Sequence, residues 1–205
     1  LKLLQQAEGG ASDADIAAVL HAVDRFRILC AVRQGPDGVE ALNRLIERAM
    51  LQRLGGRIEG RWPHGQALLI TRNSPSLGLS NGDVGLVIHT GHTEIKAQPR
   101  FYWMEGQEVR HIACSRLPEV EAAFAMTIHK SQGSEFDHVA LVLPAAGSSV
   151  VTREWVYTGL TRARKRLWLS ATPQSLASAA QRQTLRMGGL ASRLRTVSAA
   201  RPAEA

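Results

Sequence analysis

Residues 124–144, FAMTIHKSQGSEFDHVALVLP, constrain the fold of this chain more than any other stretch. Two apolar runs, residues 123–128 and 138–143, flank a polar turn at residues 129–135 that contains glycine. This pattern predicts a strand, a polar loop with about one helical turn, and a second strand. In open α/β sheets, ligands bind beyond the carboxyl ends of strands, where helix amino-termini and free backbone N–H groups gather. The polar turn is therefore the first place to expect chemistry.

Strands and helices alternate on both sides of this stretch. Residues 26–32, FRILCAV, are continuously apolar apart from one arginine, as in a strand buried on both faces. Residues 38–54 carry apolar side chains at helical spacing and predict an amphipathic helix that follows this strand. Similar patterns predict a buried strand at 67–71, a helix at 152–164 and a closing strand at 166–170. The alternation is typical of an α/β domain with a parallel sheet.

Between residues 77 and 118 the pattern changes to short alternating segments separated by turn signals such as NGD and TGH. This spacing predicts a small antiparallel β-barrel inserted in the α/β domain. Its strands are expected at residues 84–89, 94–98, 101–104 and 109–113. A helix capped by Ser12 or Asp13 is expected at 13–24, and a terminal helix at 173–186. The expected division is a helical linker at 1–24, the α/β domain at 25–76 and 119–187, the inserted barrel at 77–118 and a frayed tail at 188–205.

The composition narrows the class of protein. The 44% apolar and 21% charged residues are typical of a soluble globular chain, and the net charge of +7 favours a polyanionic partner. No apolar stretch approaches the roughly 18 residues that cross a bilayer, so no membrane contact is expected. Cys30 and Cys114 give neither a disulfide framework nor a zinc-binding spacing, which favours a reducing, cytoplasmic setting without a metal site. The chain begins at Leu1 inside a helical pattern, so we expect a fragment of a longer protein.

The polar turn offers the first group of candidate residues. Gly133 permits close approach of a phosphate to the backbone, and His129 and Lys130 can meet anionic oxygens. Glu135 can accept a hydrogen bond from a ribose hydroxyl. An ordinary solvated turn explains the same residue types, and a lone histidine such as His129 is common in exposed loops.

The second group lies at the end of the predicted helix 152–164. A guanidinium held there, that of Arg162, can reach a γ-phosphate in a bidentate manner and stabilise charge in phosphoryl transfer. Arg164 and Lys165 have a structural explanation, because cations favour the carboxyl end of a helix dipole.

The third group follows buried strands. Arg33 comes after the strand 26–32, and Arg72 and Asn73 come after the strand 67–71. Ligands gather at such strand ends, although turn chemistry also explains Asn73 and a surface role explains either arginine.

One absence is informative as well: the 205 residues contain no GxxxxGK[ST] phosphate loop and no apolar strand ending in paired carboxylates for magnesium. The chain is therefore not a complete nucleotide hydrolase.

Four segments in the range 26–170 resemble superfamily-one DNA helicases. FAMTIHKSQGSEFDHVALVLP resembles their motif V, VTREWVYTGLTRARKRLWL their motif VI, and RILCAVRQGPDGVEALN their motif IV. LLITRNSPSLGLSNGDVGLVI resembles the segment that leads into the inserted barrel of this superfamily. The combination of QGP-G-V-LN, RN-LGL-NGD-G and HKSQGSEFDH is most similar to the RecD family, the alpha chains of exodeoxyribonuclease V.

The resemblance implies a second RecA-like motor domain with a small barrel insertion. In such helicases, ATP with Mg²⁺ lies between two RecA-like domains, and the first domain supplies the phosphate loop and the magnesium ligands. Arg162 then matches the arginine finger, and Arg33 matches a second arginine near the γ-phosphate. The residues implied in nucleotide contact are Gly133, Glu135 and Gln132, and those implied in contact with single-stranded DNA are Thr127, His129, Lys130, Arg72 and Asn73.

The function implied is that of the carboxy-terminal motor half of a RecD-type, ATP-dependent helicase subunit. Its partners are expected to be single-stranded DNA and other subunits of an exodeoxyribonuclease V complex, which unwinds DNA in double-strand break repair. Translocation is expected to run 5′ to 3′, and the chain alone is expected to lack ATPase activity. The alternative is a non-catalytic module that binds single strands without a motor.

Two residues depart from the family pattern: Ser74 replaces an acidic residue, and Gly159 replaces an alanine at a cost of about 1 kcal/mol to the helix.

Overall fold

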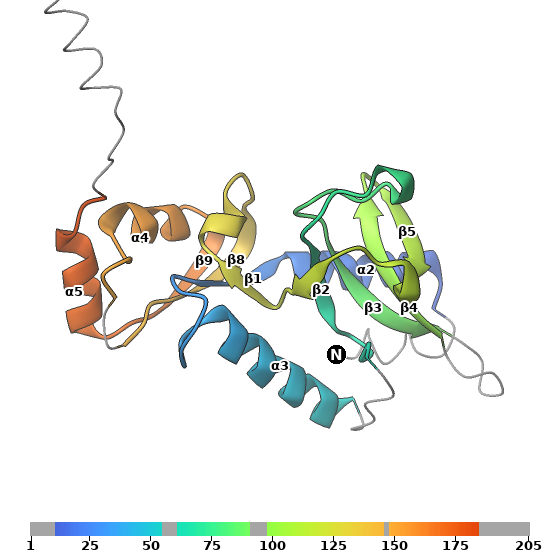
Figure 1. The fold of residues 1–205 in the computed structure, drawn as a ribbon, viewed down its shortest axis with the longest axis horizontal. Coiled ribbons are helices and arrows are strands. Elements are labelled where there is room, and N and C mark those ends of the chain that lie inside the picture. The colour runs from blue at the N-terminus through green and yellow to red at the C-terminus, as the bar shows by residue number, and fades with distance from the viewer. Residues whose placement is uncertain (1–10, 55–60, 91–97, 146–147, 185–205) are drawn as a thin grey trace, which may run out of the picture.

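The computed structural model describes residues 11–54, 61–90, 98–145 and 148–184, which form two sheets connected end to end (Figure 1). The described α-helices are α2 (Asp13–Asp24), α3 (Val39–Arg53), α4 (Arg153–Leu160) and α5 (Pro173–Gln181). The described strands are β1 (Phe26–Cys30), β2 (Ala67–Ile70), β3 (Val84–Thr90), β4 (Gln98–Glu105), β5 (Glu108–Ala113), β6 (Val120–Ala122), β7 (Ala125–Thr127), β8 (Phe136–Val142) and β9 (Ala163–Ser170). The expected tail at 188–205 and most of the expected strand at 94–98 lie outside the described residues.

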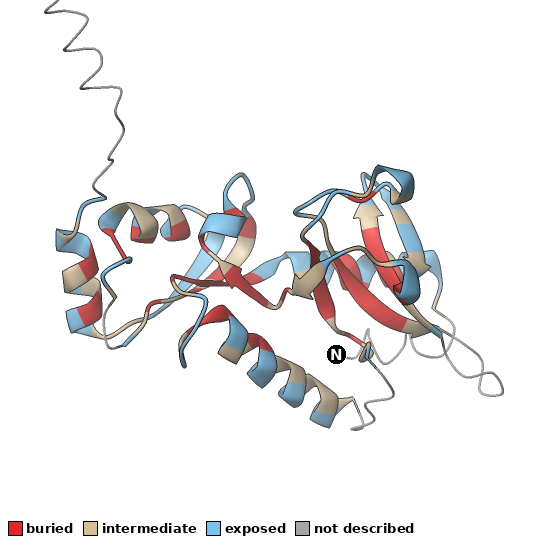
Figure 2. Ribbon diagram, in the orientation of Figure 1, coloured by how far each residue is buried: buried red, intermediate tan, exposed pale blue. Residues whose placement is uncertain are grey.

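The first sheet is parallel and confirms the predicted α/β fold. Its strand order is β7-β1-β8-β9, and Leu29 of β1 lies opposite Met126 of β7 and Leu141 of β8. Helix α3 packs on one face through Val39, which clusters with Cys30. Helices α4 and α5 cover the other face, where Leu29 and Leu141 are buried (Figure 2). Strands covered on both faces need nearly continuous apolar sequence, which is the pattern seen in β1.

The second sheet is antiparallel and larger than the predicted insertion at 77–118. Its order is β5-β4-β3-β2-β6, so it includes β2 and β6, which the predicted boundaries assign to the α/β domain. A short apolar run has no periodicity that distinguishes a parallel from an antiparallel strand, which explains the difference. The end strands β5 and β6 are not paired with each other in the described part, so the strands form an open sheet rather than a closed barrel.

Helix α2 belongs to this antiparallel sheet. The predicted helix at 13–24 is confirmed, and Ser12 caps it by accepting a hydrogen bond of 3.3 Å from the Asp15 N–H. Ile16, Val19 and Leu20 are buried in one cluster with side chains of β2, β3 and β4. The segment predicted to be a linker is therefore part of a hydrophobic core.

The predicted helix at 152–164 is shorter than expected. Helix α4 ends at Leu160, and the basic residues Arg164, Lys165 and Arg166 lie in β9. Arg164 donates to Glu135 at 2.9 Å and Lys165 donates to Asp137 at 2.8 Å. These pairs and the ladder to β8 hold the basic residues in a strand, so they do not stabilise the end of a helix.

The two cysteines are free thiols. Cys30 and Cys114 are both buried, and burial raises the pKa of each thiol to about 12. None of the described helices is long and apolar enough to cross a membrane.

The chain passes from the antiparallel to the parallel sheet between Ala122 and Ala125, and two buried side chains hold this crossover. The Asn43 amide of α3 donates to the Ala122 carbonyl at 3.1 Å and to the Ala125 carbonyl at 2.9 Å. It also accepts from the Ala125 N–H at 2.8 Å. Arg27 of β1 is 1% exposed and donates to the Ala123 carbonyl at 2.8 Å. We call Asn43, Arg27 and residues 122–125 the crossover clamp.

Replacing Asn43 by leucine is expected to destabilise the fold by about 2–5 kcal/mol, because two buried backbone groups of Ala125 and the partly buried Ala122 carbonyl lose a hydrogen-bond partner. Urea unfolding of the variant measures the change in the free energy of unfolding. The exposed Arg48 of the same helix provides the control: Arg48→Leu is expected to change the free energy by less than about 0.5 kcal/mol. A loss below about 1 kcal/mol for Asn43→Leu would contradict the clamp.

Candidate functional site

The turn between β7 and β8 runs from one edge of the parallel sheet to the other. Thr127, Cys30 and Val142 lie in register where β7, β1 and β8 end, and this side is the carboxyl edge. Phe136 and Ala163 lie in register where β8 and β9 begin, and this side is the amino edge. Strand β8 has 7 residues, so at about 3.3 Å per residue the two edges are about 20 Å apart.

Arg162 lies at the amino edge. It follows the carboxyl end of α4 and precedes β9, so it stands in a turn rather than on the predicted helix. Its Nε donates to the Thr158 carbonyl at 3.1 Å, Nη1 to the Ser134 carbonyl at 3.0 Å, and Nη2 to the Thr161 hydroxyl at 3.2 Å. All three acceptors are neutral, and no ion pair of the described residues includes Arg162. The guanidinium is held in place while its charge is not neutralised.

The exposed part of the turn reaches the same edge. Gln132, Gly133 and Glu135 are all exposed. Gly133 has a φ of +86°, a conformation that side chains with a Cβ rarely adopt, which explains the glycine. The Glu135 carboxylate accepts from Arg164 at 2.9 Å. Its predicted contact with a ribose therefore stays a prediction, as do the nucleotide contacts of Gln132 and Gly133.

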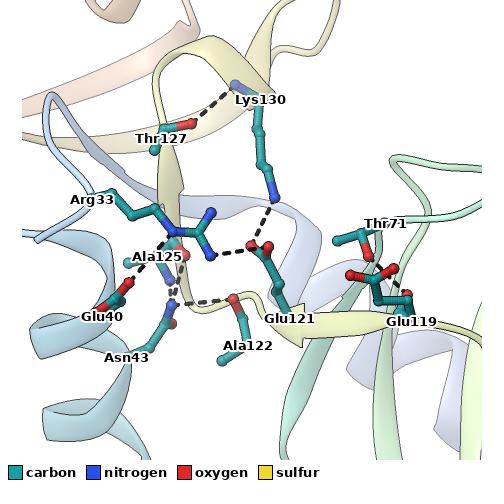
Figure 3. Close-up of polar contacts among 10 residues, drawn as sticks. All are labelled: Arg33, Glu40, Asn43, Thr71, Glu119, Glu121, Ala122, Ala125, Thr127 and Lys130. Carbon is teal, nitrogen blue, oxygen red and sulfur yellow. Dashed lines mark hydrogen bonds and ion pairs between the residues drawn. The ribbon is translucent and has the colours of Figure 1, made fainter.

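A second cluster lies at the carboxyl edge, around Glu121 of β6 (Figure 3). Arg33 donates to Glu121 Oε1 at 3.1 Å, and Lys130 donates to Glu121 Oε2 at 2.7 Å. Arg33 also lies 3.4 Å from the Glu40 carboxylate of α3. Partial burial raises the pKa of the Glu121 carboxyl, but hydrogen bonds from Lys130 and Arg33 outweigh this effect and hold the pKa below its ordinary value. We call Arg33, Lys130 and Glu121 the carboxylate cluster.

Sequence reasoning missed Glu121. It is a single acidic residue in a three-residue strand, VEA, and no motif includes it. The signal that was available is weak: a charged residue stands in the apolar surroundings that precede the motif V segment. Only the pairing of β6 with β2 and the proximity of β7 bring Glu121 next to Lys130.

The remaining predicted DNA contacts lie near this cluster. Thr127 accepts from the Lys130 N–H at 3.3 Å, and the His129 ring lies 6.1 Å from the ring of Trp155. Arg72 and Asn73 are exposed residues that follow β2. The last residue of β2 pairs with Val120, the neighbour of Glu121. Asn73 also accepts from the Asn81 N–H at 2.6 Å, so it has the structural role in a turn that its residue type favours.

The structure does not bring Arg33 and Arg162 together. Arg33 follows the carboxyl end of β1, whereas Arg162 precedes the amino end of β9, and the edges are about 20 Å apart. A single phosphate group cannot contact both in this arrangement. Arg162 and the residues after β2 do not share the edge of Arg33 for two reasons: Arg162 precedes its strand, and β2 belongs to the other sheet. Among the described residues, no group of three or more His, Cys, Asp or Glu side chains could hold a metal ion.

Gly159 allows α4 to pack closely on β8 just before Arg162. A Cβ at this position would lie 2.8 Å from Leu141 Cδ1 and 3.5 Å from Ile128 Cδ1. Leu141 is fully buried, so its side chain has little room to move. Helix propensity favours alanine at position 159, whereas packing favours glycine.

The change Gly159→Ala is expected to destabilise the fold by about 1 kcal/mol, since overpacking of about 1–3 kcal/mol exceeds the gain of about 1 kcal/mol in helix propensity. Leu141→Val removes a methyl group from the contact. The double variant is therefore expected to be at least about 0.5 kcal/mol more stable than the sum of the single changes. Urea unfolding of the four proteins in this cycle measures the coupling, and additive changes would contradict the proposed contact.

The sequence comparisons find RecD proteins. RecBCD enzyme subunit RecD of Mycolicibacterium smegmatis is 38% identical over 181 residues, which are 88% of this chain and 31% of that protein. RecBCD enzyme subunit RecD of Haemophilus influenzae is 39% identical over 166 residues, which are 80% of this chain and 24% of that protein. A family profile described as UvrD-like helicase C-terminal domain matches residues 122–170. The predicted resemblance to the RecD family is confirmed, and the chain spans about a third or less of the length of these curated relatives.

The fold resembles that of a solved helicase. The crystal structure of Pif1 helicase from Candida albicans matches with a TM-score of 0.51 and 15% sequence identity, covering 97% of this chain and 57% of that chain. At this identity the likeness concerns the fold alone. It supports a RecA-like α/β arrangement for the parallel sheet.

Proposed function

Since this chain is related to the RecBCD enzyme subunit RecD over most of its length, we propose that it is the carboxy-terminal motor half of an ATP-dependent DNA helicase subunit. In this proposal it works in a longer RecD-type protein, within an exodeoxyribonuclease V complex that unwinds DNA in double-strand break repair. Its partners are single-stranded DNA and the other subunits of that complex. Translocation runs 5′ to 3′, as the resemblance implies.

The state of Arg162 carries this proposal. Three neutral oxygens orient its guanidinium, and no carboxylate of the described residues neutralises it. Its neighbours on β9, Arg164 and Lys165, are both paired with carboxylates. An oriented and uncompensated cation suits the charge that develops on a γ-phosphate, because no competing ion pair has to be broken first. A module that only binds single strands has no use for such an arrangement.

ATP with Mg²⁺, when bound, supplies a triphosphate whose hydrolysis provides the free energy for movement along DNA. The residues at the amino edge fit the triphosphate: Arg162 offers a cation, and Gly133 gives the exposed turn a backbone without a Cβ. Glu135 and Gln132 lie in the same exposed turn, and in this proposal they contact the rest of the nucleotide. The magnesium ligands and the phosphate loop belong, in this proposal, to the first motor domain of the longer protein. The 205-residue chain alone then does not turn over ATP.

The carboxyl edge is the DNA side of the proposal. Thr127, His129 and Lys130 follow β7 at this edge, while Arg72 and Asn73 follow β2, which pairs with β6 in the other sheet. We add Arg33 to this group, since it shares Glu121 with Lys130 and lies far from Arg162. Such contacts follow the phosphate backbone, and their strength depends on salt far more than on base sequence. One turn, residues 128–135, then connects the DNA side to the nucleotide side, so closure on ATP can shift the DNA contacts.

Replacing Arg162 by alanine in the complete protein is expected to reduce DNA-stimulated ATP turnover by at least about 100-fold, because the finger acts on charge in the transition state. Binding of ATP and of single-stranded DNA is expected to stay close to wild type. Steady-state ATPase assays and binding titrations measure the two effects. Arg110→Ala, which removes an exposed arginine of β5, is the control and is expected to leave turnover unchanged. Turnover near wild type in Arg162→Ala would show that Arg162 is not the finger.

Replacing Lys130 by alanine is expected to weaken binding of single-stranded DNA and to reduce its salt dependence by about one unit of slope, without abolishing ATP turnover at saturating DNA. Fluorescence anisotropy with a labelled oligothymidylate across a series of salt concentrations measures both quantities. Lys165→Ala is a matched control, because Lys165 also forms a lysine–carboxylate pair but lies at the amino edge. Equal effects of the two changes would contradict the assignment of the carboxyl edge to DNA. A complete protein that binds single strands but shows no ATP turnover would support the non-catalytic alternative.

A further inference from the structure

Glu121 binds two cations of the DNA side, Arg33 and Lys130, at once. One carboxylate oxygen accepts from Arg33 and the other accepts from Lys130, so a single anionic group bridges two elements (Figure 3). Arg33 lies in the loop after β1, and Lys130 lies in the turn after β7. In this arrangement each cation already has an anionic partner, so a second anion meets a partly compensated charge while the bridge is closed.

A phosphodiester is chemically similar to the Glu121 carboxylate that the two cations bind. Carboxylates and phosphates both present two anionic oxygens to lysine and to the guanidinium fork. The three side chains are also accessible: the exposed fractions are 52% for Arg33, 31% for Lys130 and 34% for Glu121. A hollow of about 310 Å³ adjoins Arg33 and Glu121, so a ligand can approach the bridge from solvent.

The backbone that carries Glu121 is fixed. Its neighbour Ala122 is held by Asn43, and Glu121 itself is paired with Leu69 of β2. The carboxylate can therefore leave the cations by rotating its side chain, whereas the strand stays in place. Apart from Glu121, Glu40 is the described carboxylate paired with Arg33, at 3.4 Å. It does not reach Lys130 in any ion pair of the described residues, so Glu121 is the group that bridges the two cations.

We propose that Glu121 competes with a backbone phosphate of single-stranded DNA for Arg33 and Lys130. This inference rests on the proposed function and deepens it. The carboxylate keeps the two cations together when no DNA is bound. When a phosphate replaces it, the lost ion pairs lower the net gain in binding free energy. A translocating protein has to release each phosphate as well as bind it, and an internal competitor gives the cations a partner at the moment of release. The source of the phosphate is DNA rather than the nucleotide, because the carboxylate cluster lies at the opposite edge from Arg162.

The test is single-stranded DNA binding by the complete protein carrying Glu121→Gln, a change that keeps the shape of the side chain and removes its charge. Glu119→Gln is the matched control: Glu119 is exposed, lies two residues away, and accepts from Thr71 through its backbone carbonyl rather than its carboxylate. Both variants lose one negative charge, so a general electrostatic effect is equal in the two. Fluorescence anisotropy with a labelled oligothymidylate, without nucleotide and across a salt series, measures the dissociation constants.

Glu121→Gln is expected to bind about three- to tenfold more tightly than Glu119→Gln at low salt, since the phosphate no longer has to displace an ion pair. Its salt dependence is expected to be steeper by about one unit of slope, because the unpaired cations now release counterions on binding. Adding Lys130→Ala to Glu121→Gln is expected to remove most of the gain in affinity for the oligonucleotide. Urea unfolding checks that both variants are as stable as wild type, which separates competition from a structural role.

Equal or weaker binding by Glu121→Gln relative to Glu119→Gln would overturn the competition while leaving the proposed function intact. Wild-type protein that fails to bind the oligonucleotide at all would overturn both. The Michaelis constant for ATP at saturating DNA is expected to be unchanged in Glu121→Gln. A variant that binds ATP more tightly, with no change for the oligonucleotide, would overturn the assignment of the cluster to a DNA phosphate.

Discussion

The crossover clamp is the constraint on which the rest of the structure depends. Within residues 122–125 the chain leaves an antiparallel sheet and enters a parallel one, so neither ladder can satisfy all of its backbone groups. Asn43 and Arg27 supply the missing partners from α3 and β1. Buried polar groups without partners are costly, so side chains, and not only apolar packing, specify where the chain passes from one sheet to the other. The clamp also fixes the two segments that carry the site. Glu121 lies just before residues 122–125, and the motif V turn follows β7 just after them.

The sequence predicted elements best where a local pattern decides the structure. Helices α2 and α3 show amphipathic spacing and a good cap or a break at their ends, and both lie within one or two residues of the predicted bounds. The apolar runs of β1 and β8, residues 28–30 and 139–142, lie where both faces of the sheet are covered. The strand β2 was predicted, but its place in the antiparallel sheet could not be, because its partners β3 and β6 are decided by long-range pairing. The end of α4 was missed for a similar reason: the pairing of Arg164 and Lys165 with β8 outweighs their helix propensity.

The sequence proposes residues for the candidate site, but it could not predict how they are arranged in space. Arg162, Gly133 and Glu135 do share the amino edge, and Lys130 and Thr127 do share the carboxyl edge. Arg33 lies at the carboxyl edge rather than at the amino edge with Arg162, because the direction of its strand decides the edge. A motif does not report the direction of a strand. Glu121 has no motif at all. Its importance comes from geometry, because a single carboxylate stands between two cations that come from separate loops.

The pairing of β2 with β6 has a consequence for the way this protein can change. The chain departs from the parallel-sheet unit along β2 and returns along β6, and Leu69 and Glu121 lie side by side in register. Entry and exit are thus a fixed distance apart, whatever lies between them. Lengthening or exchanging the hairpins of β3, β4 and β5 leaves the two anchor strands in place and adds little closure entropy, because this cost grows only slowly with loop length. The antiparallel sheet can therefore diversify as a replaceable module on a parallel-sheet unit whose own geometry stays constant.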